Sequence, residues 1–189
     1  MGLLDALLLA VGLAMDAAAV CAARGLVARQ VSPAARKRVA LYFGGSQALM
    51  PLAGWLLARA IGSFAASWLP LVGGALLVYL GIKMGRESFQ ADREDVARFA
   101  GKGVDPFEAS LLMPLALATS IDALAAGLVL DRFTLPVLVT VSLIGLVTAG
   151  LSLAAIEFAK TLGERIGKAS HLLGAGLLVL IGVRLLIVR

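Results

Sequence analysis

Six stretches of this chain are each apolar and long enough to cross a lipid bilayer as an α-helix, which needs roughly 17 to 25 residues. The stretches are Leu3–Ala23, Val39–Ile61, Trp68–Met84, Ala109–Leu130, Thr134–Phe158 and His171–Val188. None of them shows the alternation of apolar and polar residues that membrane β-strands require. The sequence therefore predicts an all-α membrane protein with six transmembrane helices.

The composition excludes an ordinary soluble domain. Of 189 residues, 60% are hydrophobic and only 15% are charged, with a mean hydropathy of +0.96. The single cysteine, Cys21, excludes an intrachain disulfide, and no Cys/His cluster has the spacing of a zinc site. We interpret Cys21 as a small packing residue.

Basic residues are distributed unevenly between the predicted loops, and positive loops tend to stay in the cytoplasm. With the N-terminus outside, the cytoplasmic loops would hold Arg24, Arg29, Arg36, Lys37, Arg38, Lys83, Arg86, Arg93, Arg98, Lys102, Lys160, Arg165 and Lys168. Only Arg59, Arg132, Arg184 and Arg189 would lie outside. We expect a multi-pass protein of a bacterial cytoplasmic membrane with both termini outside. The basic loops lack interleaved aromatic residues, so nucleic-acid binding is not expected.

The sequence pattern indicates an internal repeat of a three-helix unit. Residues 73–83 align with residues 174–184 at an offset of 101, and the same offset pairs Gln47 with Thr148. An offset of 106 places Asp16 on Asp122. Because three helices is an odd number, the second unit must enter the membrane from the opposite side, as in the inverted repeats of secondary transporters. We predict repeats at residues 1–105 and 106–189 that form one transmembrane domain and move against each other.

Asp16 and Asp122 each lie near the middle of an apolar stretch. A carboxylate at bilayer depth costs several kcal/mol, so it normally faces a protein interior or a water-filled path and has a function. The equivalent positions of the two aspartates indicate one shared site. The alternative is a buried structural pair.

Four further residues could supply ligands near these carboxylates. Thr119 and Ser120 precede Asp122, and Met15 precedes Asp16. Pro51 cannot donate a hydrogen bond to the carbonyl of Gln47, so Gln47 could offer both a side-chain and a backbone oxygen. The hydroxyls could instead bond back to the preceding turn, and Met15 could be ordinary packing.

Two carboxylates surrounded by neutral oxygens suit a divalent cation, and a thioether favours softer transition metals over Mg²⁺ or Ca²⁺. Manganese, iron and cadmium all remain possible on this chemistry. The same carboxylates accept protons, so metal and proton would compete for one place. That competition is the physical basis of an antiporter.

The chain resembles the MntP family of bacterial manganese efflux pumps, within the LysE-type exporter superfamily. The resemblance rests on residues 15–17 in the first stretch, on 43–44, 51–52 and 54–55 in the second, on 118–123 in the fourth, and on 173–174 and 177 in the last. It implies Mn²⁺ export across the cytoplasmic membrane by a transporter, not an enzyme, with no cofactor and with both aspartates essential.

The chain also departs from this family at several positions. Ala18 stands where an aromatic residue is common, Cys21 where a hydroxyl is common, and His171 where an acidic residue is common. Some relatives have Glu at the position of Gln47. If the acidic residue served ion entry or proton release, His171 would alter that step.

Three other functions fit part of the pattern. Intramembrane aspartyl proteases also carry two aspartates, but their second aspartate normally follows Gly-x-Gly, whereas Asp122 follows Thr-Ser-Ile. An amino-acid exporter of the same superfamily should show a larger cavity, and a passive metal channel would show no proton coupling. The segment Lys83–Glu108 mixes both charges, which is typical of a solvated loop.

Overall fold

The computed structural model describes residues 1–28, 30–61, 68–87, 105–162 and 165–187, and all regular structure within these ranges is helical. The all-α prediction is therefore confirmed. The elements are α1 (Leu3–Val27), α2 (Pro33–Val39), the π-helical turn η1 (Ala40–Gly44), α3 (Gly45–Ile61), α4 (Leu69–Glu87), α6 (Ala109–Thr119), α7 (Ile121–Gly127), the 3-10 turn η2 (Leu130–Arg132), α8 (Val137–Leu162) and α9 (Arg165–Ile187).

Several of these helices meet the demands of a membrane span. Within the described residues, three segments are long and apolar enough to cross a bilayer, namely Leu3–Leu26, Ala109–Gly127 and Val137–Ala159. Two shorter apolar helical segments are Leu71–Lys83 and Leu172–Ile187. The membrane-protein class follows from these helices, whereas the count of six spans stays a prediction.

The observed helices begin and end at different residues from the apolar stretches predicted from the sequence. The second stretch starts as helix at Pro33, because Ser32 caps that end by accepting a hydrogen bond from the Ala35 N–H at 3.1 Å. Helix α4 continues to Glu87, so the interpretation of residues 83–87 as loop was wrong. Charged residues there extend the helix beyond the apolar stretch. The rest of that segment, up to residue 104, lies outside the described residues.

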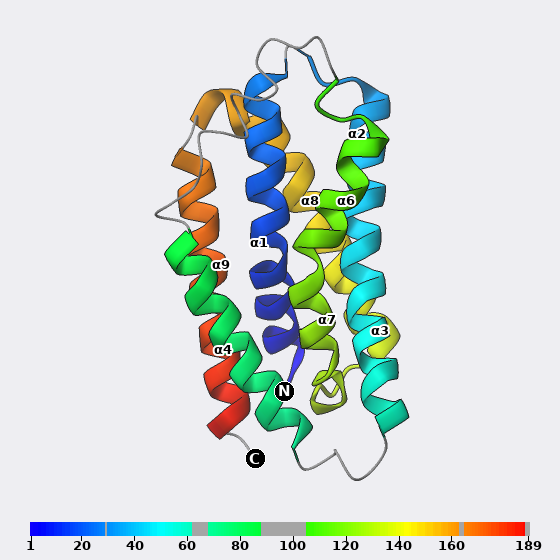
Figure 1. Cartoon of the computed structure of the whole chain (residues 1–189), viewed down its shortest axis with the longest axis vertical. Coiled ribbons are helices and arrows are strands. Elements are labelled where there is room, and N and C mark those ends of the chain that lie inside the picture. Colours follow the sequence, from blue (N-terminus) through cyan, green and yellow to red (C-terminus); the bar gives the residue numbers. More distant parts are fainter. Residues whose placement is uncertain (29, 62–67, 88–104, 163–164, 188–189) are drawn as a thin grey trace.

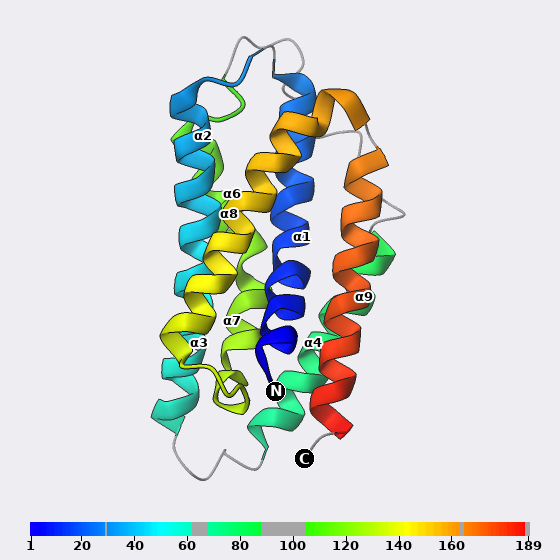
Figure 2. The same ribbon diagram turned by 180° about the vertical axis from the view of Figure 1, so that it is seen from behind.

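The helices form an elongated bundle in which α1 lies between two groups (Figures 1 and 2). On one side of α1, α4 and α9 pack along each other; on the other side, α3 packs against α7 and α8. The N-terminus and the C-terminal end of α9 lie at the same end of the bundle (Figure 1).

The two halves of the chain are interleaved. Helix α1 makes its main contacts with α8 and α9, which follow 110 or more residues later, and α7 makes its main contact with α3. Each aspartate-bearing helix therefore packs chiefly on helices of the other half.

Glycines let the helices approach closely, and two of these close contacts are reciprocal. A Cβ placed on Gly44 would lie 2.9 Å from the carbonyl oxygen of Gly145 and 2.9 Å from the Cβ of Ala149. A Cβ placed on Gly145 would lie 2.8 Å from the carbonyl oxygen of Gly44 and 2.9 Å from the Cβ of Ala48. Gly44 and Gly145 are 101 positions apart, as are Ala48 and Ala149, and this is the offset of the sequence alignment.

The contact between α4 and α9 has the same reciprocal form. A Cβ on Gly81 would lie 2.7 Å from the Ala175 carbonyl oxygen, and a Cβ on Gly182 would lie 2.8 Å from the Gly74 carbonyl oxygen. Gly81 and Gly182, and likewise Gly74 and Ala175, are again 101 residues apart. Both contacts join a helix of one half to its counterpart in the other.

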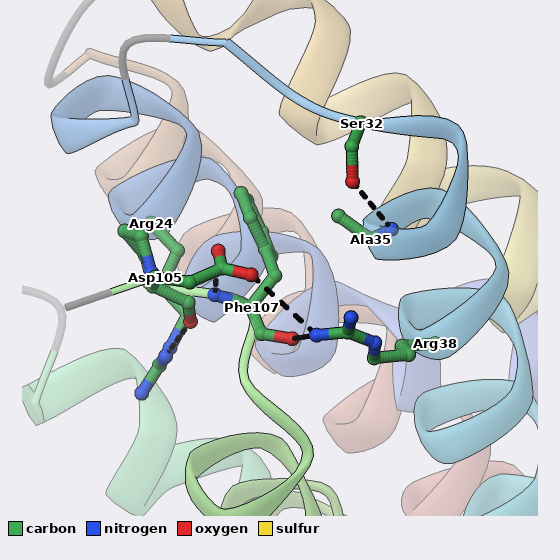
Figure 3. A network of polar contacts seen from close by, with 7 residues as sticks. Arg24, Ser32, Ala35, Arg38, Asp105 and Phe107 are labelled. Atoms are coloured by element: carbon green, nitrogen blue, oxygen red, sulfur yellow. Dashed lines mark hydrogen bonds and ion pairs between the residues drawn. The ribbon is translucent and has the colours of Figure 1, made fainter.

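Two arginines of the first half form hydrogen bonds with the segment that precedes α6 (Figure 3). Arg24 of α1 donates a hydrogen bond to the Pro106 carbonyl, and Arg38 of α2 donates one to the Phe107 carbonyl at 2.9 Å. Arg38 also contacts the Asp105 carboxylate at 3.5 Å, and that carboxylate accepts a hydrogen bond from the Phe107 N–H. The side chain of Phe107 is buried. These contacts fix where α6 starts relative to α1 and α2.

Candidate functional site

A layer of polar side chains separates two apolar clusters in the middle of the bundle. The first cluster, which includes Leu13, Ala123 and Ile144, lies toward the end with the chain termini; the second, which includes Phe43 and Ala116, lies toward the other end. Between them in sequence, on α1, α3, α6, α7 and α8, stand the members of the polar layer: Asp16, Ser46, Gln47, Thr119, Ser120, Asp122 and Thr148. Ser152 follows one turn later on α8, within the second cluster. All six residues named as candidate ligands from the sequence lie in this layer or directly beside it.

The two aspartates have matching local geometry. One carboxylate oxygen of Asp16 accepts a hydrogen bond from the N–H of Ala17 at 2.6 Å, and one of Asp122 accepts from the N–H of Ala123 at 2.8 Å. Both residues are partly accessible to solvent, although they lie between the apolar clusters. The turns that precede the two aspartates both contact the side chain of Gln47. The fold therefore brings together the two residues that the repeat predicted to be equivalent.

Gln47 joins the two aspartate-bearing segments. Its side chain is fully buried, and its amide nitrogen donates hydrogen bonds to the carbonyl of Leu13 in α1 at 3.2 Å and to that of Thr119 in α6 at 3.0 Å. Leu13 and Thr119 each stand three residues before an aspartate and are 106 positions apart, the offset that aligns the aspartates. The amide oxygen of Gln47 is buried and has no hydrogen-bond partner among the described residues.

Thr119 and Ser120 lie where the backbone of the fourth apolar stretch breaks between α6 and α7. Their hydroxyls donate hydrogen bonds back to the preceding turn, Thr119 to Ala116 at 3.2 Å and Ser120 to Leu117 at 3.0 Å. Ser120 has φ −102° and ψ 5°, outside the helical region. Such hydroxyl contacts compete with helical hydrogen bonds and bend helices. The lone pairs of both oxygens remain able to accept further contacts.

Met15 and His171 are less informative. Met15 is partly buried and packs against the first apolar cluster. His171 belongs to α9, but its side chain lies outside what the structure describes. Cys21 is a buried free thiol in the second apolar cluster, in line with a packing role.

Sequence reasoning did not single out Ser46, Thr148 or Ser152 as site residues. Ser46 donates a hydrogen bond to the Ala116 carbonyl at 3.0 Å, while Thr148 and Ser152 lie fully buried on α8. The signal for Thr148 was its alignment with Gln47 in the repeat. That alignment supported the repeat but was not used to assign a ligand.

The chemistry of this layer suits a hard or borderline cation. Two carboxylates supply negative charge, and hydroxyl, amide and carbonyl oxygens supply neutral ligands. Among the described residues, no group of three or more His, Cys, Asp or Glu side chains could hold a metal ion.

An apolar helical bundle with a polar carboxylate layer at mid-height defines an integral membrane protein of the kind that moves ions or small solutes. Comparison with known proteins gives the family. The sequence model of the MntP family, described as "Putative manganese efflux pump", matches residues 30–186, and the chain belongs to this family. The resemblance noted from the motifs is confirmed.

Curated relatives match over nearly their whole length and carry that same description with the name MntP. The chain is 44% identical to one from Sorangium cellulosum over 188 residues, covering 96% of this chain and 94% of the relative. It is 37% identical to one from Oleidesulfovibrio alaskensis over 182 residues, covering 95% and 93%. It is 31% identical to one from Methanosphaera stadtmanae over 185 residues, covering 98% and 99%. No solved structure matches the chain.

Proposed function

We propose that this protein exports manganese(II) across the cytoplasmic membrane in exchange for protons, and that the ion binds between Asp16 and Asp122. The observation that supports the site is that one buried amide, that of Gln47, bonds to the carbonyls of Leu13 and Thr119, each three residues before an aspartate. Family membership carries the choice of ion and the transport class. Gln47, Thr119 and Ser120 supply oxygens, and Met15 supplies the thioether beside Asp16.

Proton exchange follows from the same carboxylates. A carboxylate that binds a proton loses the charge that attracts a divalent cation. Lower pH on the outer side therefore releases the ion there, and the higher cytoplasmic pH favours metal binding. Exchange of protons for the ion does not require a separate proton site.

The inverted repeat is part of this proposal. The reciprocal glycine contacts are what a pseudo-twofold axis between two halves would produce: Gly44 meets Gly145, and the contact of Gly81 with Ala175 is matched by that of Gly182 with Gly74. Counting α2–η1–α3 as one span and α6–α7 as another gives six spans with α1, α4, α8 and α9. An even number of spans agrees with both chain ends lying at one end of the bundle (Figure 1).

Orientation follows from charge. The end of the bundle opposite the chain ends carries Arg24, Arg36, Lys37 and Arg38, so we assign that end to the cytoplasm. The groups of helices that move together during transport follow the helix contacts and not the two halves of the sequence. Since α1 packs on α8 and α9, a rigid movement of the first half alone would break its main contacts.

Metal flux into inside-out proteoliposomes tests the proposal. The flux of Mn²⁺, Cd²⁺, Fe²⁺, Mg²⁺ and Ca²⁺ is compared, with a lumenal pH dye reporting proton movement. We expect Mn²⁺ uptake with opposite proton movement, and we expect Asp16→Asn and Asp122→Asn each to abolish it while the protein still folds.

Other results would change the assignment. Transport retained by both single mutants would remove the two-aspartate site. Metal flux without proton movement would indicate a passive channel. No flux of any divalent ion would favour amino-acid export first and intramembrane proteolysis second.

A further inference from the structure

Within the part of the chain that the structure describes, two buried hydroxyls on α8, those of Thr148 and Ser152, lack the hydrogen bond that helical hydroxyls normally make. Buried Ser and Thr side chains on helices usually donate to a carbonyl in the preceding turn. In the described residues, Ser46, Thr119, Ser120 and Thr140 all do so. The hydroxyl of Thr148, on α8, is fully buried and has no partner there. A buried polar group without a partner costs about 1 to 3 kcal/mol, so its retention calls for a reason.

The packing of α1 on α8 brings Thr148 to the level of Asp16. The two helices run in the same direction (Figure 1). A Cβ on Gly25 would lie 3.0 Å from the Ile156 carbonyl oxygen, and one turn earlier the side chain of Cys21 lies beside that of Ser152. Both pairs are separated by 131 residues. Continuing the same register by one further turn puts Thr148 at the level of Ala17, the neighbour of Asp16.

Thr148 also occupies the counterpart position of Gln47. Each residue stands three positions after the glycine at which η1 and α8 touch, Gly44 before Gln47 and Gly145 before Thr148. The Gln47 amide oxygen is likewise buried and without a partner among the described residues. Two unpartnered neutral oxygens thus come from equivalent places on two helices in contact.

We propose that Thr148 is a ligand of the transported cation and pairs with the amide oxygen of Gln47 to supply its neutral oxygens. The inference rests on the proposed two-aspartate site and extends it to α8. Two carboxylates neutralise a divalent ion, and neutral oxygens complete its shell without adding charge. In this arrangement α1, α3, α7 and α8 all contribute to the ion site.

The test is Mn²⁺ binding to the full-length protein in lipid nanodiscs, followed by the electron paramagnetic resonance signal of free Mn²⁺. Thr148→Val keeps the shape of the side chain and removes the hydroxyl. We expect it to weaken Mn²⁺ binding about tenfold, while Thr148→Ser binds close to wild type. The matched control is Thr140→Val, a buried threonine on the same helix whose hydroxyl is satisfied by the Pro136 carbonyl at 3.3 Å. It should bind Mn²⁺ as the wild type does.

The aspartate variants distinguish failure of the Thr148 proposal from failure of the two-aspartate site on which it rests. If Asp16→Asn and Asp122→Asn bind Mn²⁺ unchanged, the two-aspartate site itself fails. If both lose binding while Thr148→Val binds as the wild type does, only the role of Thr148 is overturned. Should Thr148→Val not fold, Thr148→Ser and Thr148→Ala form a second pair. Both shorten the side chain and only the alanine lacks the hydroxyl, so equal Mn²⁺ affinities would also overturn the proposal.

Discussion

The two segments that carry the aspartates differ in the continuity of their backbone. Helix α1 runs unbroken through Asp16, whereas the equivalent segment divides into α6 and α7 just before Asp122. At the positions where the first segment has Leu13 and Ala14, the second has Thr119 and Ser120. The hydroxyls of the second pair bond back to the preceding turn. The two aligned segments thus have different backbones, and the hydroxyl hydrogen bonds of Thr119 and Ser120 lie at the break.

The same two segments differ in how they meet their partner helices. A Cβ on Gly127 of α7 would lie 2.2 Å from the Pro51 carbonyl oxygen of α3. The repeat places Cys21 of α1 where Gly127 stands, and Ala155 of α8 where Gly54 stands. The broken segment is therefore held by a glycine contact, while its continuous counterpart tolerates side chains at the same place.

Their anchors differ as well. Near the start of α1, Asp5 is buried, accepts a hydrogen bond from the Gly2 N–H at 2.8 Å and contacts Arg184. Before α6, Asp105 and Arg38 form an exposed pair at 3.5 Å. The second aspartate segment thus has the more exposed ion pair and a backbone break beside its carboxylate, even though Arg24 and Arg38 also donate hydrogen bonds to the carbonyls of Pro106 and Phe107. We infer that it is the more easily displaced of the two during transport.

The largest effect is expected where α7 contacts α3 through Gly127. Gly127→Ala should destabilise the protein by about 3 kcal/mol, because backbone atoms of α3 would have to move. Cys21→Ala, the repeat counterpart, should cost only about 1 kcal/mol for the lost sulfur contacts. The measurement is the unfolding temperature of both purified variants in the same detergent. Equal unfolding temperatures would show that the glycine contact is not specific to the second segment.

The next effect compares the two anchors. Arg184→Gln should cost about 2 kcal/mol, since Asp5 is buried and would lose its cationic partner. Arg38→Gln should cost less, about 1 kcal/mol, because the exposed pair with Asp105 contributes little and the main loss is the hydrogen bond to the Phe107 carbonyl. Thermal unfolding of the two variants at matched salt measures the difference. A larger loss for Arg38→Gln would contradict the view that the second aspartate segment is the more easily displaced of the two.

The sequence predicted the parts of this comparison that depend on residue type and position. The helical class followed from the apolar stretches, and the pairing of Asp16 with Asp122 followed from the repeat. The π-helical turn at residues 40–44 and the contacts of Gln47 depend on which helices pack together. Helix packing could not be predicted from the residue pattern of a single sequence. The break at Ser120 had a visible signal in Thr119 and Ser120, which we considered only as ligands and as hydroxyls bonding to the preceding turn.

The smallest effect tests the origin of the break itself. Ser120→Ala gives the second segment the alanine that α1 has at Ala14, and it removes the hydrogen bond to the Leu117 carbonyl. The loss should be about 1 kcal/mol, a fall of about 2 to 4 °C in unfolding temperature. Adding Thr119→Leu completes the match to α1 and should let the helix close. Slower amide hydrogen exchange at residues 121–124 would then report the closed helix. Exchange as fast as in the wild type would mean that packing against α3, and not the hydroxyls, holds the break open.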